Sequence, residues 1–152
     1  IFSIDPSAGI DQATIDLWQS LDEYQVPRLV VVTHLEKLEA DFDDAVMIAT
    51  RVFDQMTTPF LVLHDEAGLP AALIGLADLQ IIDYSTQPSV SRSSDVEHQT
   101  LVQEFRDEYL ELVAAAGEKA FSAGLLFPAI PLWIERGIGI DIVEGFIKQL
   151  VE

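Results

Sequence analysis

The stretch that decides the fold is Val26-Pro-Arg-Leu-Val-Val-Val-Thr-His-Leu-Glu-Lys-Leu-Glu-Ala-Asp-Phe42. Residues 29–32 form a continuous apolar run rich in valine, which is typical of a strand buried on both faces of a parallel sheet. The polar tetrapeptide Thr33-His-Leu-Glu36 follows where this strand leaves the sheet, and a helical pattern begins near Asp41. Ligands of open α/β sheets bind outside the carboxyl ends of the strands. The stretch therefore predicts a ligand site at residues 33–36.

The segments on either side predict alternating strands and helices. Residues 1–4 read as a short buried strand, and Asp11 is a suitable N-cap for a helix whose apolar residues repeat as far as Tyr24. A second helical stripe runs from Phe42 to Met56. The order strand, helix, strand, helix indicates parallel pairing with right-handed crossovers.

The pattern changes between residues 58 and 122, where we expect an insert. Short apolar runs at 60–64, 71–75 and 79–84, separated by turn residues, predict a small antiparallel β meander. Ser85–Asp95 is predicted to be a polar, mobile loop. A long helix is expected over residues 96–120, with these side chains facing inward: Leu101 or Val102, Phe105, Tyr109, Leu112 and Ala116.

Residues 123–152 return to the first pattern. A strand is predicted over residues 125–132, and its prolines 128 and 131 favour an edge position or an early exit from the ladder. A last helix is predicted over residues 140–151. The expected fold class is therefore α/β, with mainly parallel strands and flanking helices in residues 1–57 and 123–152. A small antiparallel β insert and a long helix occupy residues 58–122.

Composition excludes several classes of function. The chain has 152 residues, 26 acidic against 8 basic side chains, a formal net charge of −18 and no cysteine. Such an acidic surface repels phosphate backbones, so no direct nucleic-acid binding through the bulk surface is expected. Neither a thiolate metal site nor a membrane span is predicted. Because the chain opens in an apolar run without Met, we expect it to be a piece of a longer protein.

The common catalytic motifs are missing from the sequence. His34, His64 and His98 fall in different predicted elements without metal-ligand spacing. No Gly-x-x-x-x-Gly-Lys-[Ser/Thr] phosphate loop occurs, and no Gly-x-Ser-x-Gly elbow supports a Ser-His-Asp triad. Periodicity and spacing alone predict an acidic α/β domain.

A collinear set of short motifs is more specific. In chain order the motifs are Gly9-Ile-Asp-Gln-Ala-Thr14, Leu17-Trp18, Tyr24, Val26-Pro-Arg28, Thr33-His-Leu-Glu36, Gly75-Leu-Ala-Asp-Leu79, and Phe127-Pro-Ala-Ile130 followed by Gly139. This series resembles the GTPase domain of the translation elongation factor G family. That family has Gly-Val-x-x-Gln-[Ser/Thr], Val-Trp, Tyr, Val-Pro-Arg and Asn-Lys-x-Asp in the same order, and an insert with Gly-x-x-Asp-Leu. Ala13 departs from the family's Gln.

The resemblance implies the second half of a P-loop-NTPase-like domain, with the phosphate loop and switches upstream of Ile1. The chain alone is then no enzyme, and its expected nucleotide-binding residues are Thr33, His34, Glu36, Trp133 and Ile134. Glu36 replaces the Asp that accepts the guanine N–H donors, His34 replaces the Lys along the base, and Thr33 replaces the Asn. Trp133 and Ile134 stand where the family has small residues. These departures are similar to those of elongation-factor-G-like paralogues, and they leave open either weak guanine binding or a nucleotide-inert relic.

The resemblance also implies cofactors and partners. GTP or GDP with Mg would bind the intact parent, and none is expected to bind tightly to this chain alone. The expected partners are the ribosome and its stalk protein, in the cytoplasm and without a membrane. The alternative is a nucleotide-inert acidic α/β scaffold or protein-binding module.

Overall fold

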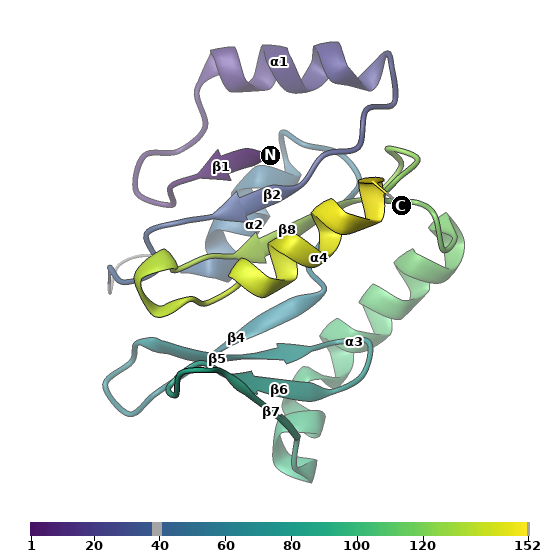
Figure 1. Ribbon diagram of the computed structural model, residues 1–152. Coiled ribbons are helices and arrows are strands. Elements are labelled where there is room, and N and C mark those ends of the chain that lie inside the picture. The colour runs from purple at the N-terminus through teal and green to yellow at the C-terminus, as the bar shows by residue number, and fades with distance from the viewer. Residues whose placement is uncertain (38–40, 152) are drawn as a thin grey trace.

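The computed structural model describes residues 1–37 and 41–151. Its first sheet is parallel throughout and has the strand order β1-β2-β8-β3. The strands are β1 (Phe2–Ile4), β2 (Val30–Val32), β8 (Phe127–Pro131) and β3 (Met56–Thr57). The valines of β2 are buried on both faces, as the sequence predicted. The predicted α/β class is confirmed (Figure 1).

The second sheet is antiparallel, in the order β4-β5-β6-β7. Its strands are β4 (Phe60–His64), β5 (Pro70–Gly75), β6 (Gln80–Asp83) and β7 (Val90–Ser93). The prediction of a mobile loop over Ser85–Asp95 is wrong for the residues of β7. These residues pair with β6, from Asp83↔Val90 to Gln80↔Ser93. Every β7 side chain is exposed, so backbone pairing forms the strand without a hydrophobic signal in its sequence.

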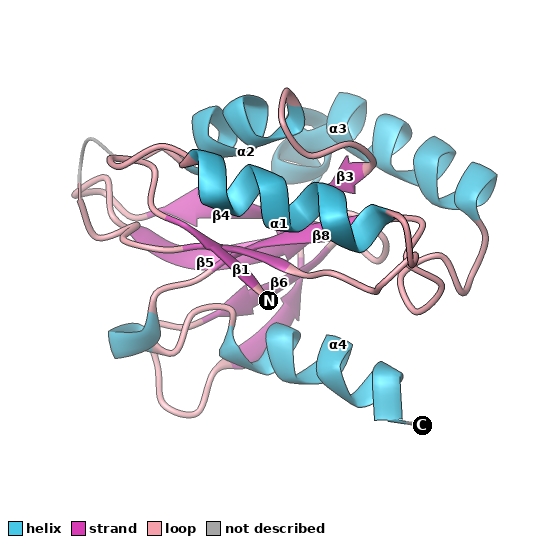
Figure 2. Cartoon of the chain, turned by 90° about the horizontal axis from the view of Figure 1, so that it is seen from above, coloured by secondary structure: helices cyan, strands magenta, loops and turns pink. Residues whose placement is uncertain are grey.

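In the described part of the chain four α-helices flank the sheets, and three of them begin at an aspartate N-cap. They are α1 (Gln12–Asp22), α2 (Phe42–Thr50), α3 (Val96–Ala116) and α4 (Ile140–Val151). Asp11, Asp41 and Asp95 accept hydrogen bonds from the first-turn N–H groups of α1, α2 and α3. Helices α1 and α2 lie on the opposite side of the parallel sheet from α4 (Figure 2). No helix in the described part of the chain is long and apolar enough to span a membrane.

Among the described residues, one hydrophobic core lies on the α1 face of the parallel sheet and another on its α4 face. On the α1 face, Trp18 stacks on Phe53 with ring centroids 4.1 Å apart, and the guanidinium of Arg28 lies 4.4 Å from the Trp18 ring centroid. On the α4 face, Ile130 and Trp133 pack together with Leu73 and Tyr84 of the antiparallel sheet. The antiparallel insert therefore shares a core with the parallel frame.

Two helices are shorter than the sequence predicted. Helix α2 ends at Thr50, and Met56 of the predicted stripe lies in β3 instead. Helix α3 ends at Ala116 because Gly117 adopts φ +92°. Val102 is buried as expected, whereas Phe105 and Leu112 are 49% and 44% exposed, because the insert's sheet covers only one side of α3.

The edge position predicted for the last strand is wrong, because β8 lies between β2 and β3. The backbone N–H of Phe127 donates to Gln55 on the β3 side, and that of Leu132 donates to Val32 on the β2 side. The backbone N–H and C=O groups of successive residues in a parallel strand point to opposite neighbouring strands. The backbone nitrogen of Pro131 therefore points toward β3, which has already ended at Thr57. Pro128 precedes the β2 pairing, which starts at Ala129. Neither proline breaks a ladder hydrogen bond.

Candidate functional site

A pocket of about 230 Å³ lies at the carboxyl edge of the parallel sheet. In the register of the sheet, Val32 at the end of β2 is level with Pro131 at the end of β8. The segments that follow these two strands therefore form facing walls of one pocket. All five residues predicted from the sequence line it: Thr33, His34, Glu36, Trp133 and Ile134. Three other residues complete the wall: Ser3, Leu132 and Glu135.

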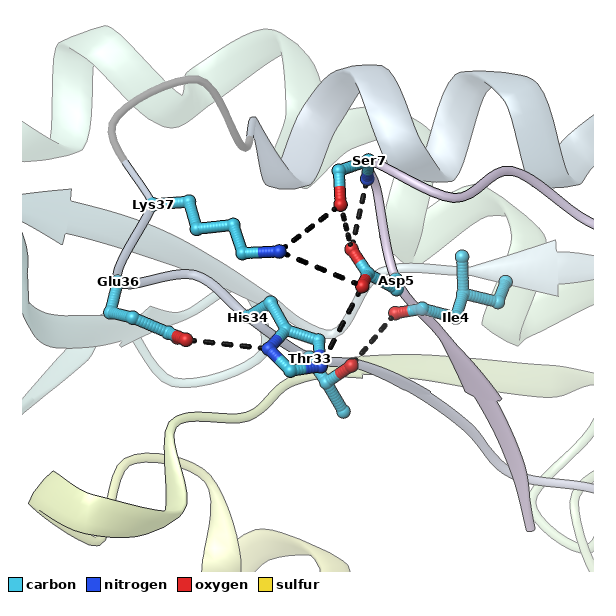
Figure 3. Close-up of polar contacts among 7 residues, drawn as sticks. All are labelled: Ile4, Asp5, Ser7, Thr33, His34, Glu36 and Lys37. Carbon is cyan, nitrogen blue, oxygen red and sulfur yellow. Dashed lines mark hydrogen bonds and ion pairs between the residues drawn. The ribbon is translucent and has the colours of Figure 1, made fainter.

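Thr33 is tied to the neighbouring strand. Its backbone N–H donates to the Ile4 carbonyl oxygen at 2.9 Å, and its hydroxyl Oγ1 donates to the same oxygen at 3.3 Å (Figure 3). The hydroxyl oxygen keeps its lone pairs for a ligand, but its proton is already used. Thr33 can therefore accept a hydrogen bond in this pocket.

The ring of His34 lies between two carboxylates. Its Nδ1 is 3.3 Å from Oε1 of Glu36, and its Nε2 is 3.6 Å from Oδ2 of Asp5 (Figure 3). The His34 backbone has φ +59°, a left-handed conformation that turns the chain sharply after β2. This turn brings the side chains of His34 and Glu36 to the same side of the pocket.

Asp5 belongs to the site but was not among the predicted residues. Its Oδ1 accepts hydrogen bonds from Ser7 Oγ at 2.7 Å and Ser7 N at 2.9 Å, and these two bonds lower the pKa of the carboxyl. Its Oδ2 faces Lys37 Nζ at 3.9 Å, and Lys37 Nζ also donates to Ser7 Oγ at 3.3 Å. The strand-end rule that predicted residues 33–36 applies equally to Asp5, because Asp5 follows β1 at the same edge of the sheet.

The opposite wall is built on Trp133. Its indole is 9% exposed and packs into the second core, and the Arg136 guanidinium lies 4.4 Å from the ring centroid. Backbone hydrogen bonds in both directions between Trp133 and Ile138 close the loop that carries it. Ile134 is 63% exposed at the rim. The indole is thus a fixed wall, and Ile134 is the accessible apolar contact.

The pocket offers mainly acceptors to a ligand. Glu36 and Glu135 present carboxylates, and Thr33 presents a hydroxyl oxygen. Acceptors of this kind can bind a planar heterocycle that carries adjacent N–H donors. Among residues 1–37 and 41–151 no group of three His, Asp or Glu side chains gathers as a metal site.

Fold and pocket together define an α/β domain with a ligand pocket at the carboxyl edge of its parallel sheet. No protein-family model matches the chain. An elongation factor G-like protein of Mycobacterium tuberculosis is 28% identical over 95% of the chain, and elongation factor G of Orientia tsutsugamushi is 25% identical over 78%. The mitochondrial ribosome-releasing factor 2 of Anopheles gambiae is 30% identical over 52%. A crystal structure of a Thermus thermophilus protein superposes on 95% of the chain with a TM-score of 0.75 and 23% identity, which supports the fold.

These matches confirm the resemblance that the collinear motifs predicted: the chain is similar to elongation factor G and elongation factor G-like proteins over most of its length. The chain spans 23% of the length of the M. tuberculosis relative, 17% of the O. tsutsugamushi relative and 10% of the A. gambiae relative.

Proposed function

We propose that the chain supplies the base-reading half of the nucleotide site of a cytoplasmic, ribosome-associated GTPase. In this role Glu36 accepts the guanine N1–H and N2–H donors, and the His34 ring lies along the base. Thr33 Oγ1 accepts a further hydrogen bond, and Trp133 and Ile134 form the apolar wall opposite. GTP or GDP, with its Mg, takes its phosphate contacts from residues outside this pocket.

One observation carries the proposal. Glu36 and Trp133 are far apart in the sequence and were predicted from separate motifs, yet their side chains line one pocket of about 230 Å³. A hydrogen bond to a charged acceptor contributes roughly 1.5–3 kcal/mol. Adenine has no N1–H, so a carboxylate at this position favours guanine over adenine.

The test is a titration of the ¹⁵N-labelled chain with GDP and with ADP, followed by amide and indole resonances. We expect GDP to shift the amides of Thr33–Glu36 and the Trp133 indole, and ADP to leave them in place. Glu36→Gln replaces one acceptor by donors and should abolish the preference. Glu135→Gln makes the same change on the other wall of the pocket and should retain it. Equal shifts with GDP and ADP, or none with either, contradict the proposal.

A second function is favoured by the outer face of α3, a protein-docking surface. Leu101, Phe105 and Leu112 are exposed at helical spacing, and Phe105 and Leu112 line a groove of about 140 Å³ between α2 and α3. The exposed carboxylates Glu104, Glu108 and Glu111 follow the same helix. An apolar groove rimmed by acidic groups suits a basic amphipathic surface, and the partner that we propose is a basic or stalk component of the ribosome.

Binding to purified stalk protein at low and moderate salt tests this surface. Glu108→Lys, which reverses a charge at the groove, should weaken binding about tenfold at low salt. Glu97→Lys makes the same change at the start of α3, away from the groove, and should have little effect. Equal binding by the wild type and Glu108→Lys rules out docking at this groove.

A further inference from the structure

The loop that carries Trp133 is held from behind by the antiparallel insert. Residues 133–139 connect β8 to α4, and one side of this loop faces the base pocket. A second hollow, of about 240 Å³, separates its other side from the β6–β7 turn. Side chains of the insert line one wall of this hollow, and the start of α4 lines the other: Tyr84, Gln87 and Ser89 against Gly137, Ile140, Asp141 and Glu144.

Tyr84 makes the shorter of two contacts across this interface. Its hydroxyl donates a hydrogen bond of 2.7 Å to Oδ1 of Asp141 in the first turn of α4. The ring is 6% exposed and packs with Ile138 and Ile142 in the second core. Burial and, next, the Asp141 hydrogen bond raise the pKa of the Tyr84 hydroxyl, so it remains a proton donor at neutral pH.

Gln87 makes the second contact, one residue from the pocket wall. Its Nε2 donates to the Arg136 carbonyl oxygen at 3.5 Å. The guanidinium of the same Arg136 lies 4.4 Å from the centroid of the Trp133 ring. The insert therefore reaches the indole through a single intervening residue, and Tyr84 fixes the end of the same loop.

From this arrangement we propose that Tyr84 and Gln87 are positioning residues for the base pocket. They hold residues 133–139 so that Trp133 and Ile134 stand opposite Thr33–Glu36. This inference rests on the proposed base-reading function and adds a structural link from the insert to that site. Ligand binding in the base pocket and the contacts of the insert are then coupled, because both act on the same loop, residues 133–139.

The experiment compares Tyr84→Phe with Tyr109→Phe in amide exchange and in the GDP and ADP titrations. Tyr109 is the control, because its ring is partly buried on α3, away from this loop. Tyr84→Phe should raise exchange at residues 134–139 about tenfold, as expected for one lost charge-assisted hydrogen bond. It should shift the Trp133 indole, leave the amides around Trp18 unchanged, and lower the guanine-over-adenine preference. Tyr109→Phe should do none of these.

Unchanged exchange at residues 134–139, or an equal rise around Trp18, overturns the positioning role. The positioning role is also overturned if Tyr84→Phe raises exchange at residues 134–139 but leaves the preference for GDP over ADP unchanged. If the wild type shows no guanine preference, the proposed function fails separately, and exchange alone then decides the role of Tyr84. Gln87→Ala alters an exposed turn residue and is the second variant if Tyr84→Phe does not fold; it should also raise exchange at 134–139.

Discussion

Glu36 is the residue on which the proposed base recognition depends, and His34 already contacts one of its oxygens. The Nδ1–Oε1 distance of 3.3 Å leaves Oε2 free to accept from a ligand. A base that used both oxygens would have to displace the imidazole. Asp5, 3.6 Å from the other ring nitrogen, offers the displaced ring an alternative partner. The contacts of His34 with Asp5 and Glu36 therefore affect how easily the Glu36 carboxylate can accept hydrogen bonds from a ligand.

Asp43, in the first turn of α2, gives a pH-dependent prediction. Burial raises the pKa of its carboxyl, and the carboxylates of Asp41 and Asp44 raise it further, while His64 opposes them. The pKa of Asp43 is therefore higher in the folded state than in the unfolded state. Its contribution to the free energy of unfolding is fully present below the unfolded pKa of 3.8, and it is lost as the pH rises through the folded pKa. Asp43→Asn should therefore gain stability relative to the wild type between about pH 3 and about pH 7.

Urea denaturation at several pH values measures this difference. Asp54→Asn removes an exposed carboxylate that does not act on Asp43 and corrects for the change in net charge. A gain for Asp43→Asn that is the same at every pH contradicts the prediction.

At the scale of elements, the start of α4 depends on one glycine. Gly139 has φ +84°, and a Cβ at this position would overlap the Pro131 carbonyl oxygen. Gly139→Ala should lower the free energy of unfolding by about 3 kcal/mol. Gly145→Ala, inside the same helix with no atom within 4 Å of the added Cβ, should raise it by roughly 1 kcal/mol. Chemical denaturation of the two variants checks the pair, and a mild effect at Gly139 would contradict the assigned backbone conformation.

The elements could be predicted from the sequence wherever burial or capping leaves a local signal. The valines of β2 and the cap Asp11 are such signals, and the strand and the start of α1 are confirmed. Strand β7 has no such signal, because its side chains are exposed and its partner β6 supplies the pairing. The central position of β8 depends on which side each proline faces, and only the assembled sheet decides that.

The five residues predicted for a nucleotide site line one pocket, and their role in binding stays a prediction. Glu36 followed from the end of a buried strand, and Trp133 from the resemblance. The sheet register explains why these two predictions meet in one place. Asp5 was missed because the motifs that carry the resemblance begin only at Gly9. Tyr84 and Gln87 carry no motif, and their link to the loop depends on tertiary packing.

At the scale of the whole molecule, the insert and the parallel frame should unfold together. Leu73 of β5 is fully buried in the same core as Leu29 and Ile130 of the frame. Leu73→Ala should cost about 3 kcal/mol and shift the urea midpoints of the Trp18 and Trp133 indole resonances equally. Leu125→Ala, at an exposed site, should change neither by more than about 0.5 kcal/mol. Separate midpoints for the two indoles would contradict a shared core.

The most direct test of the central claim, that this pocket reads guanine through Glu36, is the order of affinity for GDP, IDP and ADP. Hypoxanthine keeps the N1–H of guanine but lacks the 2-amino group, and adenine has no N1–H. Each lost bond to a charged acceptor costs roughly 1.5–3 kcal/mol. NMR titration of the chain should give affinities in the order GDP, IDP, ADP, with the three converging in Glu36→Gln. The same affinity for all three in the wild type, or an unchanged order in Glu36→Gln, would contradict it.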